Sequence, residues 1–440
     1  MGHTGHLKGE YLELLKRLGK GQVALPEPAD EDAREGWKDI LEILYTPEEA
    51  KIASRMPIMP SGLRKTAARV GMDPDELKPI LDKMADKGLV MDLVHPKTKK
   101  TAYLMSPPVV GFIEFSLMRM NDKLLPQKRL ADAMSAYMNG DRAFAEEVFG
   151  TDTVVGRALA QEEHMEDDPL PEVLDWERAK KIIEEAWCIA LSHCYCRHKA
   201  MHLGHECDVP TELCLSLNTA ADFVVRRDFG RKIDVAEALG VLETAKKHGL
   251  VQIADNAQDR PIYICNCCAC CCQQLHAINS FDMAAVNPSG FEPHFNEEMC
   301  RGCSKCARAC PITSITMEPK RVVGQIKSEM QPILNADRCI GCGVCANACK
   351  KGVITMVRRD KMPVVPKNTI ERTLRMSIEK GRLADMIFDG GSTQGRRFLS
   401  RTLRALANLP PTKQVLANEQ LQSRFIKFFI ESTRAKKSGA

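Results

Sequence analysis

The 440-residue chain has few aromatic residues, 5% in total, and no hydrophobic run that approaches the length of a membrane span. Its first twenty residues are charged and contain no apolar segment like that of an export signal. These absences favour a soluble or peripheral protein in the cytoplasm. In that reducing compartment the nineteen cysteines are not expected to form a disulfide framework.

The sequence also lacks the common signatures of nucleotide and radical chemistry. It contains no G-x-x-x-x-G-K-[ST] phosphate loop, no G-x-G-x-x-G dinucleotide fingerprint and no C-x3-C-x2-C motif of radical S-adenosylmethionine enzymes. No nucleophile–base pair stands out. These absences argue against a substrate site within the chain itself.

What the sequence does contain is a repeat. Residues 293–317 and 332–356 align with a shift of 39 positions, and 12 of the 25 aligned residues are identical. Each copy has three cysteines at two-residue gaps and a fourth after a gap of three. The two sets are Cys300, Cys303, Cys306 and Cys310, and Cys339, Cys342, Cys345 and Cys349.

This spacing is typical of iron–sulfur ligands, because a cubane cluster needs four thiolates that converge on soft iron atoms. Structural zinc also uses C-x2-C pairs, but it does not require a third cysteine two residues on and a fourth after three. Gly302, Gly341 and Gly343 suit a backbone that passes close to sulfides and needs positive φ.

Residues 291–358 resemble bacterial two-[4Fe–4S] ferredoxins. The resemblance implies that the last cysteine of each copy binds the other copy's cluster. The expected ligand sets are therefore Cys300, Cys303, Cys306 and Cys349 for cluster 1, and Cys339, Cys342, Cys345 and Cys310 for cluster 2.

The chain departs from this family in two places. Lys350 stands where the family usually has proline, and 28 residues separate Cys310 from Cys339. The extra length predicts an inserted hairpin or contact loop over Met317–Pro332.

Ten further cysteines lie upstream, in two groups. One consists of Cys194, Cys196, Cys207 and Cys214, among His193, His198, His202 and His205; the other consists of Cys265, Cys267, Cys268, Cys270, Cys271 and Cys272. Cys265, Cys268 and Cys271 repeat the two-residue gaps, and a ligand from the first group could complete their site. Three interpretations stay open: one or two more Fe–S clusters, a zinc site of mixed Cys and His ligands, or a redox-active thiol patch. We favour at least one further cluster. Cys188 is expected to be an ordinary buried thiol.

Most of residues 40–358 also resembles a little-characterised group of cytoplasmic bacterial iron–sulfur proteins. The motifs that carry this likeness are Cys194–Lys199, Ile264–Cys272, Pro107-Pro108 with Gly111–Ser116, and the eight ferredoxin cysteines. The resemblance implies electron transfer and supplies no substrate.

Residues 46–106 have the pattern of a winged helix. Helices are expected from Thr46-Pro47, over Leu63–Val70 and over Asp73–Lys87, followed by strands over Leu89–Val94 and Thr101–Met105. The third helix would be the DNA-recognition helix, but its net charge of −2 is unsuited to approaching phosphates. We therefore expect a structural or protein-binding role and no DNA contact.

Apolar spacing predicts a mostly helical region over 107–290. The expected helices include Lys128–Asn139, Arg142–Phe149 and Trp176–Leu191, and others within 217–255, one of them with Asp234 and Glu237 at capping-box spacing. Residues 261–264 have the pattern of a strand.

The C-terminal segment 357–440 carries 18 Lys or Arg against 7 Asp or Glu, a net charge of +11 in a chain of net +4. Gly390-Gly391 has the pattern of a hinge, and Arg396–Leu409 and Glu419–Glu431 are amphipathic. These helices could fold back on the acidic body, dock an acidic partner or lie on a membrane surface.

We therefore predict a multidomain α+β protein. Its parts are a helical segment 1–45, a winged-helix-like module 46–106, a helical cysteine-rich central domain 107–290, a two-cluster ferredoxin domain 291–358 and a basic helical tail 359–440.

The predicted function is one-electron relay through two or more [4Fe–4S] clusters to or from a redox partner, either a flavoprotein or a metalloenzyme. We therefore expect an electron-transfer protein or an oxidoreductase subunit without a substrate site of its own. A third or fourth cluster or a zinc ion is a further expected cofactor. The alternatives are a redox-sensing winged-helix regulator of DNA and an oxidoreductase subunit with a metal site among the central cysteines.

Overall fold

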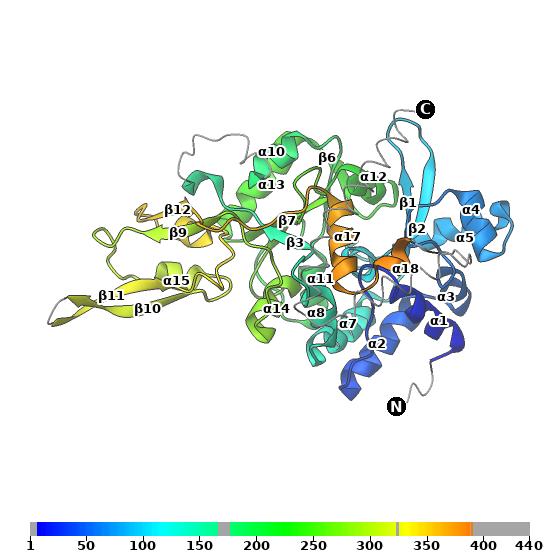
Figure 1. Cartoon of the computed structure of the whole chain (residues 1–440), viewed down its shortest axis with the longest axis horizontal. Coiled ribbons are helices and arrows are strands. Elements are labelled where there is room, and N and C mark those ends of the chain that lie inside the picture. The colour runs from blue at the N-terminus through cyan, green and yellow to red at the C-terminus, as the bar shows by residue number, and fades with distance from the viewer. Residues whose placement is uncertain (1–6, 166–176, 323–324, 388, 390–440) are drawn as a thin grey trace.

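The computed structural model describes residues 7–165, 177–322, 325–387 and 389. The ferredoxin region lies at one end of an elongated molecule, a sheet surrounded by helices lies in the middle, and the N-terminal helices lie at the other end (Figure 1). No helix within the described ranges is long and apolar enough to cross a membrane.

The N-terminal segment consists of α1 (Gly9–Leu18) and α2 (Glu31–Leu44). Asp30 caps α2 by accepting a hydrogen bond from the backbone N–H of Ala33 at 2.9 Å. Helix α2 packs closely against α7 (Gln127–Gly140). The approach requires glycine, since a Cβ on Gly36 would lie 2.5 Å from the carbonyl oxygen of Ala133.

The next module has the elements that the sequence predicts. They are α3 (Pro47–Ala53), α4 (Leu63–Val70), α5 (Pro74–Asp86) and the antiparallel strands β1 (Val90–Val94) and β2 (Thr101–Met105). Thr46 and Glu49 form the reciprocal hydrogen bonds of a capping box. Gly71 ends α4 with φ of +82°. The winged-helix assignment of this arrangement stays a prediction.

An irregular turn at Pro108–Phe112, the short helix α6 (Ile113–Phe115), and α7 and α8 (Ala143–Phe149) lead into the central domain. The predicted helices at Lys128–Asn139 and Arg142–Phe149 are thereby confirmed.

A six-stranded antiparallel sheet forms the centre of the molecule, in the order β3-β7-β8-β5-β4-β6. Its strands are β3 (Gly156–Ala158), β4 (Ile189–Ser192), β5 (Cys214–Leu217), β6 (Arg231–Ile233), β7 (Val251–Asp255) and β8 (Tyr263–Cys267). The helices around it are α10 (Ala179–Glu184), α11 (Tyr195–Leu203), α12 (Asn218–Arg226), α13 (Val235–Lys247) and α14 (Gln273–Phe281), and a short 3-10 turn lies at Glu162–His164.

The prediction of a mostly helical central domain was wrong. The expected helix Trp176–Leu191 ends early, and Ile189–Ser192 is instead a strand that pairs with β5 and β6. Two more strands, β6 and β7, interrupt the helices expected in 217–255. The cause is length: short, fully buried apolar runs have no period that separates strand from helix. Asp234 does cap α13, accepting from the N–H of Glu237.

The ferredoxin region contains β9 (Phe291–Phe295), α15 (Lys305–Ala309), β10 (Ile315–Val322), β11 (Gln325–Leu334), α16 (Val344–Ala348) and β12 (Ile354–Arg358). Strand β9 pairs with β12, and β10 pairs with β11. The latter pair is the hairpin that the extra length between Cys310 and Cys339 predicts, and it projects from the end of the molecule (Figure 1).

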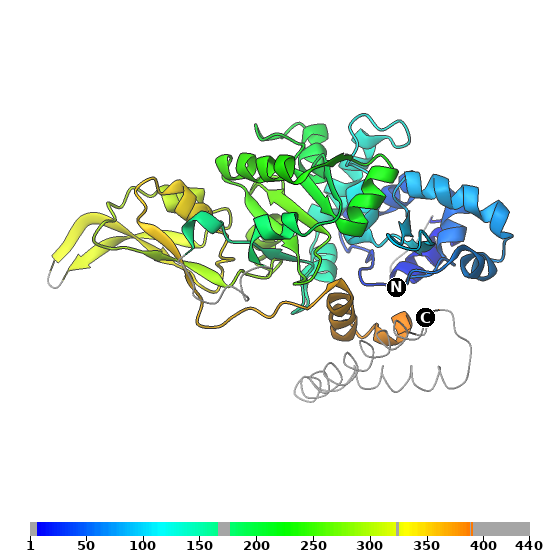
Figure 2. The same ribbon diagram turned by 90° about the horizontal axis from the view of Figure 1, so that it is seen from above.

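After β12 the chain runs back along the central domain to α17 (Thr369–Glu379) and α18 (Leu383–Ile387), as Figure 2 shows in orange. Two ion pairs fix this return: a buried one between Arg372 and Asp255 at 2.7 Å, and a half-buried one between Arg382 and Glu147 at 2.6 Å. The predicted hinge at Gly390-Gly391 and the predicted amphipathic helices Arg396–Leu409 and Glu419–Glu431 lie outside the described residues.

Candidate metal centres

The two cysteine runs of the ferredoxin region start with the same local structure. The backbone N–H groups of Cys300 and Cys339 donate to the carbonyl oxygens of Asn296 and Asn335, each at 3.1 Å. The side-chain oxygen of each asparagine also accepts from backbone N–H groups of the following turn. The repeated asparagine therefore fixes the entry into both cysteine loops.

Glycine lets these loops turn tightly. Gly302 and Gly341 have φ of +63° and +67°, and a Cβ at either position would lie 2.3 or 2.1 Å from a backbone oxygen. Gly343 has φ of +80°, and Ser304 takes the same left-handed conformation at the equivalent position of the first copy. The expected positive φ of all three glycines is confirmed.

The structure brings the four cysteines expected for cluster 2 around one small cavity. Cys339, Cys342 and Cys345 of the second run line it together with Cys310 of the first. Burial raises the pKa of the thiols of Cys339, Cys342 and Cys345, that of Cys342 to about 12. Such thiols stay protonated on their own, and a bound metal centre would favour the thiolate form by compensating its charge. The donor set and the cavity fit a cubane cluster.

The cysteines expected for cluster 1 lie further out. Cys303 is exposed, and Cys300, Cys306 and Cys349 are half-buried. Cys306 and Cys349 pack against the same small core, which contains Phe291 and Ile354. Ligation by either set of four cysteines remains a proposal.

The second copy is embedded against the central domain. Arg338 donates to the carbonyl oxygens of Ile312 at 2.6 Å and Ile278 at 3.1 Å, and pairs with Asp282 at 2.5 Å. The amide of Asn279 donates to the carbonyl oxygen of Pro311 at 3.0 Å. Helix α14 of the central domain therefore contacts the loops that carry the buried cysteine set.

The ten central cysteines divide differently from their order in the sequence. The sulfurs of one group all lie within 4.8 Å of one another; its members are Cys207, Cys268, Cys270 and Cys271. The printed Sγ–Sγ distances are 3.8 Å from Cys207 to Cys268, 3.9 Å from Cys207 to Cys271 and 3.5 Å from Cys270 to Cys271. We call this set the four-thiol group. As expected, a cysteine from the first sequence group completes it, although Cys270 takes the place foreseen for Cys265.

These distances fit a single metal ion. Four sulfurs placed tetrahedrally at about 2.3 Å from zinc are about 3.8 Å apart. No other set of three or more His, Cys, Asp or Glu ligands in the described part of the chain is as close, and that includes the eight ferredoxin cysteines. The four-thiol group therefore differs in geometry from the ferredoxin sets, whose sulfurs are spread more widely.

The other six central cysteines line a cavity of about 120 Å³. Each thiol interacts with the next one in space. The spatial order is Cys194, Cys196, Cys272, Cys267, Cys265 and Cys214. The fold explains this meeting, because Cys265 and Cys267 are two residues apart on one face of β8 and the neighbouring strand β5 begins with Cys214. Helices α11 and α14 begin at the remaining three cysteines. We call this set the six-thiol cavity.

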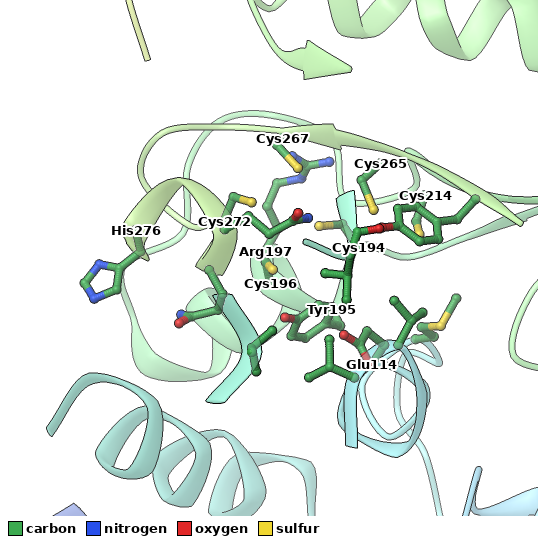
Figure 3. Close-up of a pocket in the computed structure, with 18 of the residues that line it drawn as sticks. Glu114, Cys194, Tyr195, Cys196, Arg197, Cys214, Cys265, Cys267, Cys272 and His276 are labelled. Carbon is green, nitrogen blue, oxygen red and sulfur yellow. The ribbon is translucent and has the colours of Figure 1, made fainter. Parts of the chain in front are cut away.

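Glu114 and Tyr195 close the cavity on the side opposite Cys265 and Cys267 (Figure 3). The surface that Glu114 exposes faces this enclosed space, and burial raises the pKa of its carboxyl to about 8. Its carboxylate accepts a hydrogen bond from the N–H of Gly111 at 2.7 Å. Neither residue was expected at the site. The Gly111–Ser116 motif contains Glu114, but its spacing carries no ligand pattern.

Two buried cations of α11 lie between the two thiol groups. Arg197 is 1% exposed and donates to the sulfur of Cys268 at 3.7 Å and to the carbonyl oxygen of Asn266 at 3.0 Å. Lys199 is 3% exposed, and its ammonium has no hydrogen-bond partner. Burial lowers the pKa of Lys199, and the nearby thiols of Cys196, Cys271 and Cys272 act in the opposite direction.

The histidines do not join the four-thiol group. His198 Nδ1 lies 2.8 Å from the carbonyl oxygen of Leu117, and His193 Nδ1 lies 2.9 Å from the hydroxyl of Thr211. The cysteines that the sequence offered for a zinc site do not stay together in the structure, since only Cys207 belongs to the four-thiol group. The set was Cys194, Cys196, Cys207 and Cys214. Cys188 is buried with Phe223 and Phe229 in a separate core, as expected for an ordinary thiol.

Comparison with known proteins identifies one part of the chain. Residues 299–353 match the family model described as 4Fe-4S dicluster domain. No curated protein and no solved structure shows a significant match to the chain. The match supports iron–sulfur clusters and an electron-transfer role for this segment, which is a minor part of the 440 residues.

Proposed function

We propose that the chain is a cytoplasmic electron-transfer protein that relays single electrons between a redox partner and its central cysteine-rich domain. The observation that carries this proposal is the order of the cysteine sets. An exposed set at Cys303 is followed by a buried set at Cys342, which abuts the central domain through α14.

When bound, [4Fe–4S] clusters supply reversible one-electron oxidation and reduction. The chain contributes thiolates, backbone turns and shielding from water. Cys300, Cys303, Cys306 and Cys349 would hold the outer cluster, and Cys339, Cys342, Cys345 and Cys310 the inner one. The match to a dicluster domain supports this number.

The outer end suits a docking partner. Met299 is 53% exposed beside the cysteine loop, and Cys303 is exposed within it. A flavoprotein or metalloenzyme that exchanges electrons in single steps would approach here, because of the eight ferredoxin cysteines only Cys303, in this copy, is exposed. The C-terminal segment 357–440 is a second candidate for docking, and its charge of +11 would favour an acidic partner.

The four-thiol group would hold a single ion, and zinc is our choice for it. A closed set of four thiolates at tetrahedral spacing is typical of structural zinc. Its place, in the turn after β8, suits an ion that fixes the loop carrying Cys268, Cys270 and Cys271.

The alternative of a DNA-binding regulator receives no support from α5. Arg227 of the central domain pairs with Asp82 and Asp86 of this helix at 2.8 and 2.9 Å, and with Asp92 of β1 at 2.7 Å. These contacts hold the helix against α12. A structural role for the module accounts for them.

Anaerobic reductive titration of the complete chain tests the proposal. Protein purified without air should take up at least two electrons per chain from dithionite, one for each ferredoxin cluster, and return them to an added viologen acceptor. A chain that is colourless and takes up no electrons would refute it.

A further inference from the structure

We propose that the six-thiol cavity binds a polynuclear iron–sulfur centre, distinct from the ferredoxin clusters and from the ion of the four-thiol group. This inference rests on the proposed function in one respect only: the electrons that reduce the centre would arrive through the ferredoxin region. Its composition can be tested independently of that relay.

The spread of the six sulfurs argues against zinc. Two zinc ions that shared six cysteines would each need four sulfurs about 3.8 Å apart. Within the described residues only the four-thiol group has three or more ligands inside 4.8 Å. The six thiols instead form an arc of pairwise contacts around open space. Several irons linked by inorganic sulfide would fill that space and reach sulfurs that a lone ion cannot.

The donor chemistry points the same way. All six ligating candidates are soft sulfurs from Cys194, Cys196, Cys214, Cys265, Cys267 and Cys272, and thiolate-rich sites select iron–sulfur clusters. The rest of the wall is largely apolar, with Val109, Val110 and Phe115 among the lining residues. Such a wall keeps water away from a centre that water would degrade.

The buried cations supply an independent argument. An ammonium and a guanidinium that are almost fully buried need anions nearby, because an isolated buried charge is strongly unfavourable. Lys199 and Arg197 have no carboxylate in ion-pair range among the described residues. The groups that face them are sulfurs of both thiol sets. Metal-bound thiolates with net negative charge would supply the anions that keep these two side chains charged.

The position of the cavity suits an electron acceptor. Cys272 precedes the first residue of α14, and Asn279 near the other end of that helix bonds to the ferredoxin loop at Pro311. Seven residues of helix span about 10 Å. The buried core is continuous between the two sites, with Cys272, Ile278, Ile312 and Cys342 in one cluster.

Metal and sulfide analysis of matched variants tests the proposal. Wild-type protein should contain iron and acid-labile sulfide in excess of the eight of each that two [4Fe–4S] clusters supply. The double variant Cys265→Ala/Cys272→Ala should lose that excess and keep the ferredoxin iron. Cys207→Ala/Cys270→Ala should lose zinc, and Cys188→Ala, which alters a buried thiol outside both groups, should lose neither.

The charge argument gives a second readout that does not remove a ligand. Lys199→Met should lower the midpoint potential of the additional dithionite-reducible EPR signal, because a positive charge that stabilises the reduced form is gone. Lys199→Arg should keep the potential near that of the wild type. Lys180→Met, which alters an exposed lysine, is the control and should have no effect.

Each outcome decides the question. An iron and sulfide content of eight each, or an excess that survives Cys265→Ala/Cys272→Ala, would overturn the proposal, as would zinc in place of the excess iron. Should the double variant fail to fold, an additional signal whose potential is unchanged in Lys199→Met would overturn it. A chain without ferredoxin clusters could still contain iron and sulfide that Cys265→Ala/Cys272→Ala removes. That result would contradict the proposed relay and support the cavity assignment.

Discussion

The two copies of the ferredoxin repeat differ far more in their surroundings than in their sequence. Both begin with the same asparagine-anchored turn and use left-handed backbone at equivalent positions. Yet Cys303 of the first copy is exposed, whereas Cys339, Cys342 and Cys345 of the second are all buried. Arg338 of the second copy contacts α14 and the residue that follows it, which places this copy against the central domain. The first copy has the exposed Met299 at the equivalent position.

This comparison teaches that cysteine spacing sets what a loop can bind, while the packing around it sets what the bound centre does. The exposed copy suits exchange with another protein. The buried copy suits transfer within the chain. Four predictions would break or sharpen this distinction.

The largest effect is expected for the loss of a cluster ligand. Cys345→Ala and Cys306→Ala should each remove about four iron atoms, one cluster's content. Only Cys345→Ala should also prevent reduction of the central domain and sharply lower the thermal midpoint, because its thiol lies in the core beside that domain. Iron analysis, calorimetry and EPR after dithionite would measure this. Equal stability losses in the two variants would contradict the distinction between an inner and an outer copy.

The next effect concerns the backbone turn of the inner copy. Gly341→Ala should destabilise the protein strongly, since a Cβ there would lie 2.1 Å from the carbonyl oxygen of Phe291 in addition to the positive φ. Gly352→Ala is the matched control: its φ is +62°, but nothing lies within 4 Å of its added Cβ. The control should cost about 1 kcal/mol, the price of the left-handed conformation alone. If the two variants had the same thermal midpoint, the close approach of Gly341 to Phe291 would not matter.

A smaller effect is expected at the contact between the inner copy and α14. Arg338→Ala should cost about 2–4 kcal/mol, because its guanidinium donates to two backbone carbonyls and pairs with a carboxylate. Met299→Ala at the equivalent position of the outer copy should cost less than about 0.5 kcal/mol. The comparison uses denaturant unfolding without air. A cost at Arg338 as small as that at Met299 would mean that this contact does not hold the inner copy in place.

The last prediction concerns a pH dependence in the central domain, where the expected change is one of slope. The folded state keeps Glu114 protonated up to a pKa of about 8, whereas the unfolded chain releases that proton near the ordinary value of 4.5. Stability from this group is therefore complete at low pH and is lost as pH rises between these values, by at most about 1.4 kcal/mol per pH unit. Glu114→Gln should flatten that decline between pH 6 and 8, as thermal midpoints would show. An unchanged slope in the variant would place the titration elsewhere.

Much of the ferredoxin region could be predicted from the sequence, because its information is local. The cysteine gaps, the glycines at positive φ and the inserted hairpin at β10 and β11 all follow from short-range patterns. The capped helices from Thr46 to Gly71 were predictable for the same reason.

The central domain was less predictable, because it depends on contacts between distant segments. Strand β4 is too short to show a period, and apolar spacing alone predicts a helix that continues through Ile189–Leu191. The division of the central cysteines depends on the pairing of β5 with β8, which brings Cys214 to Cys265 and leaves Cys207 for the four-thiol group. Glu114 enters the cavity from a separate segment, and no spacing in the sequence indicates that.

The central claim is that the doubled cysteine run holds two redox-active [4Fe–4S] clusters. Iron and acid-labile sulfide analysis of the complete chain, purified without air, combined with EPR before and after dithionite, tests it most directly. The account predicts at least eight iron and eight sulfide per chain and a signal that dithionite induces from two neighbouring reduced clusters. Zinc in place of iron at these cysteines, with no labile sulfide and no induced signal, would contradict it.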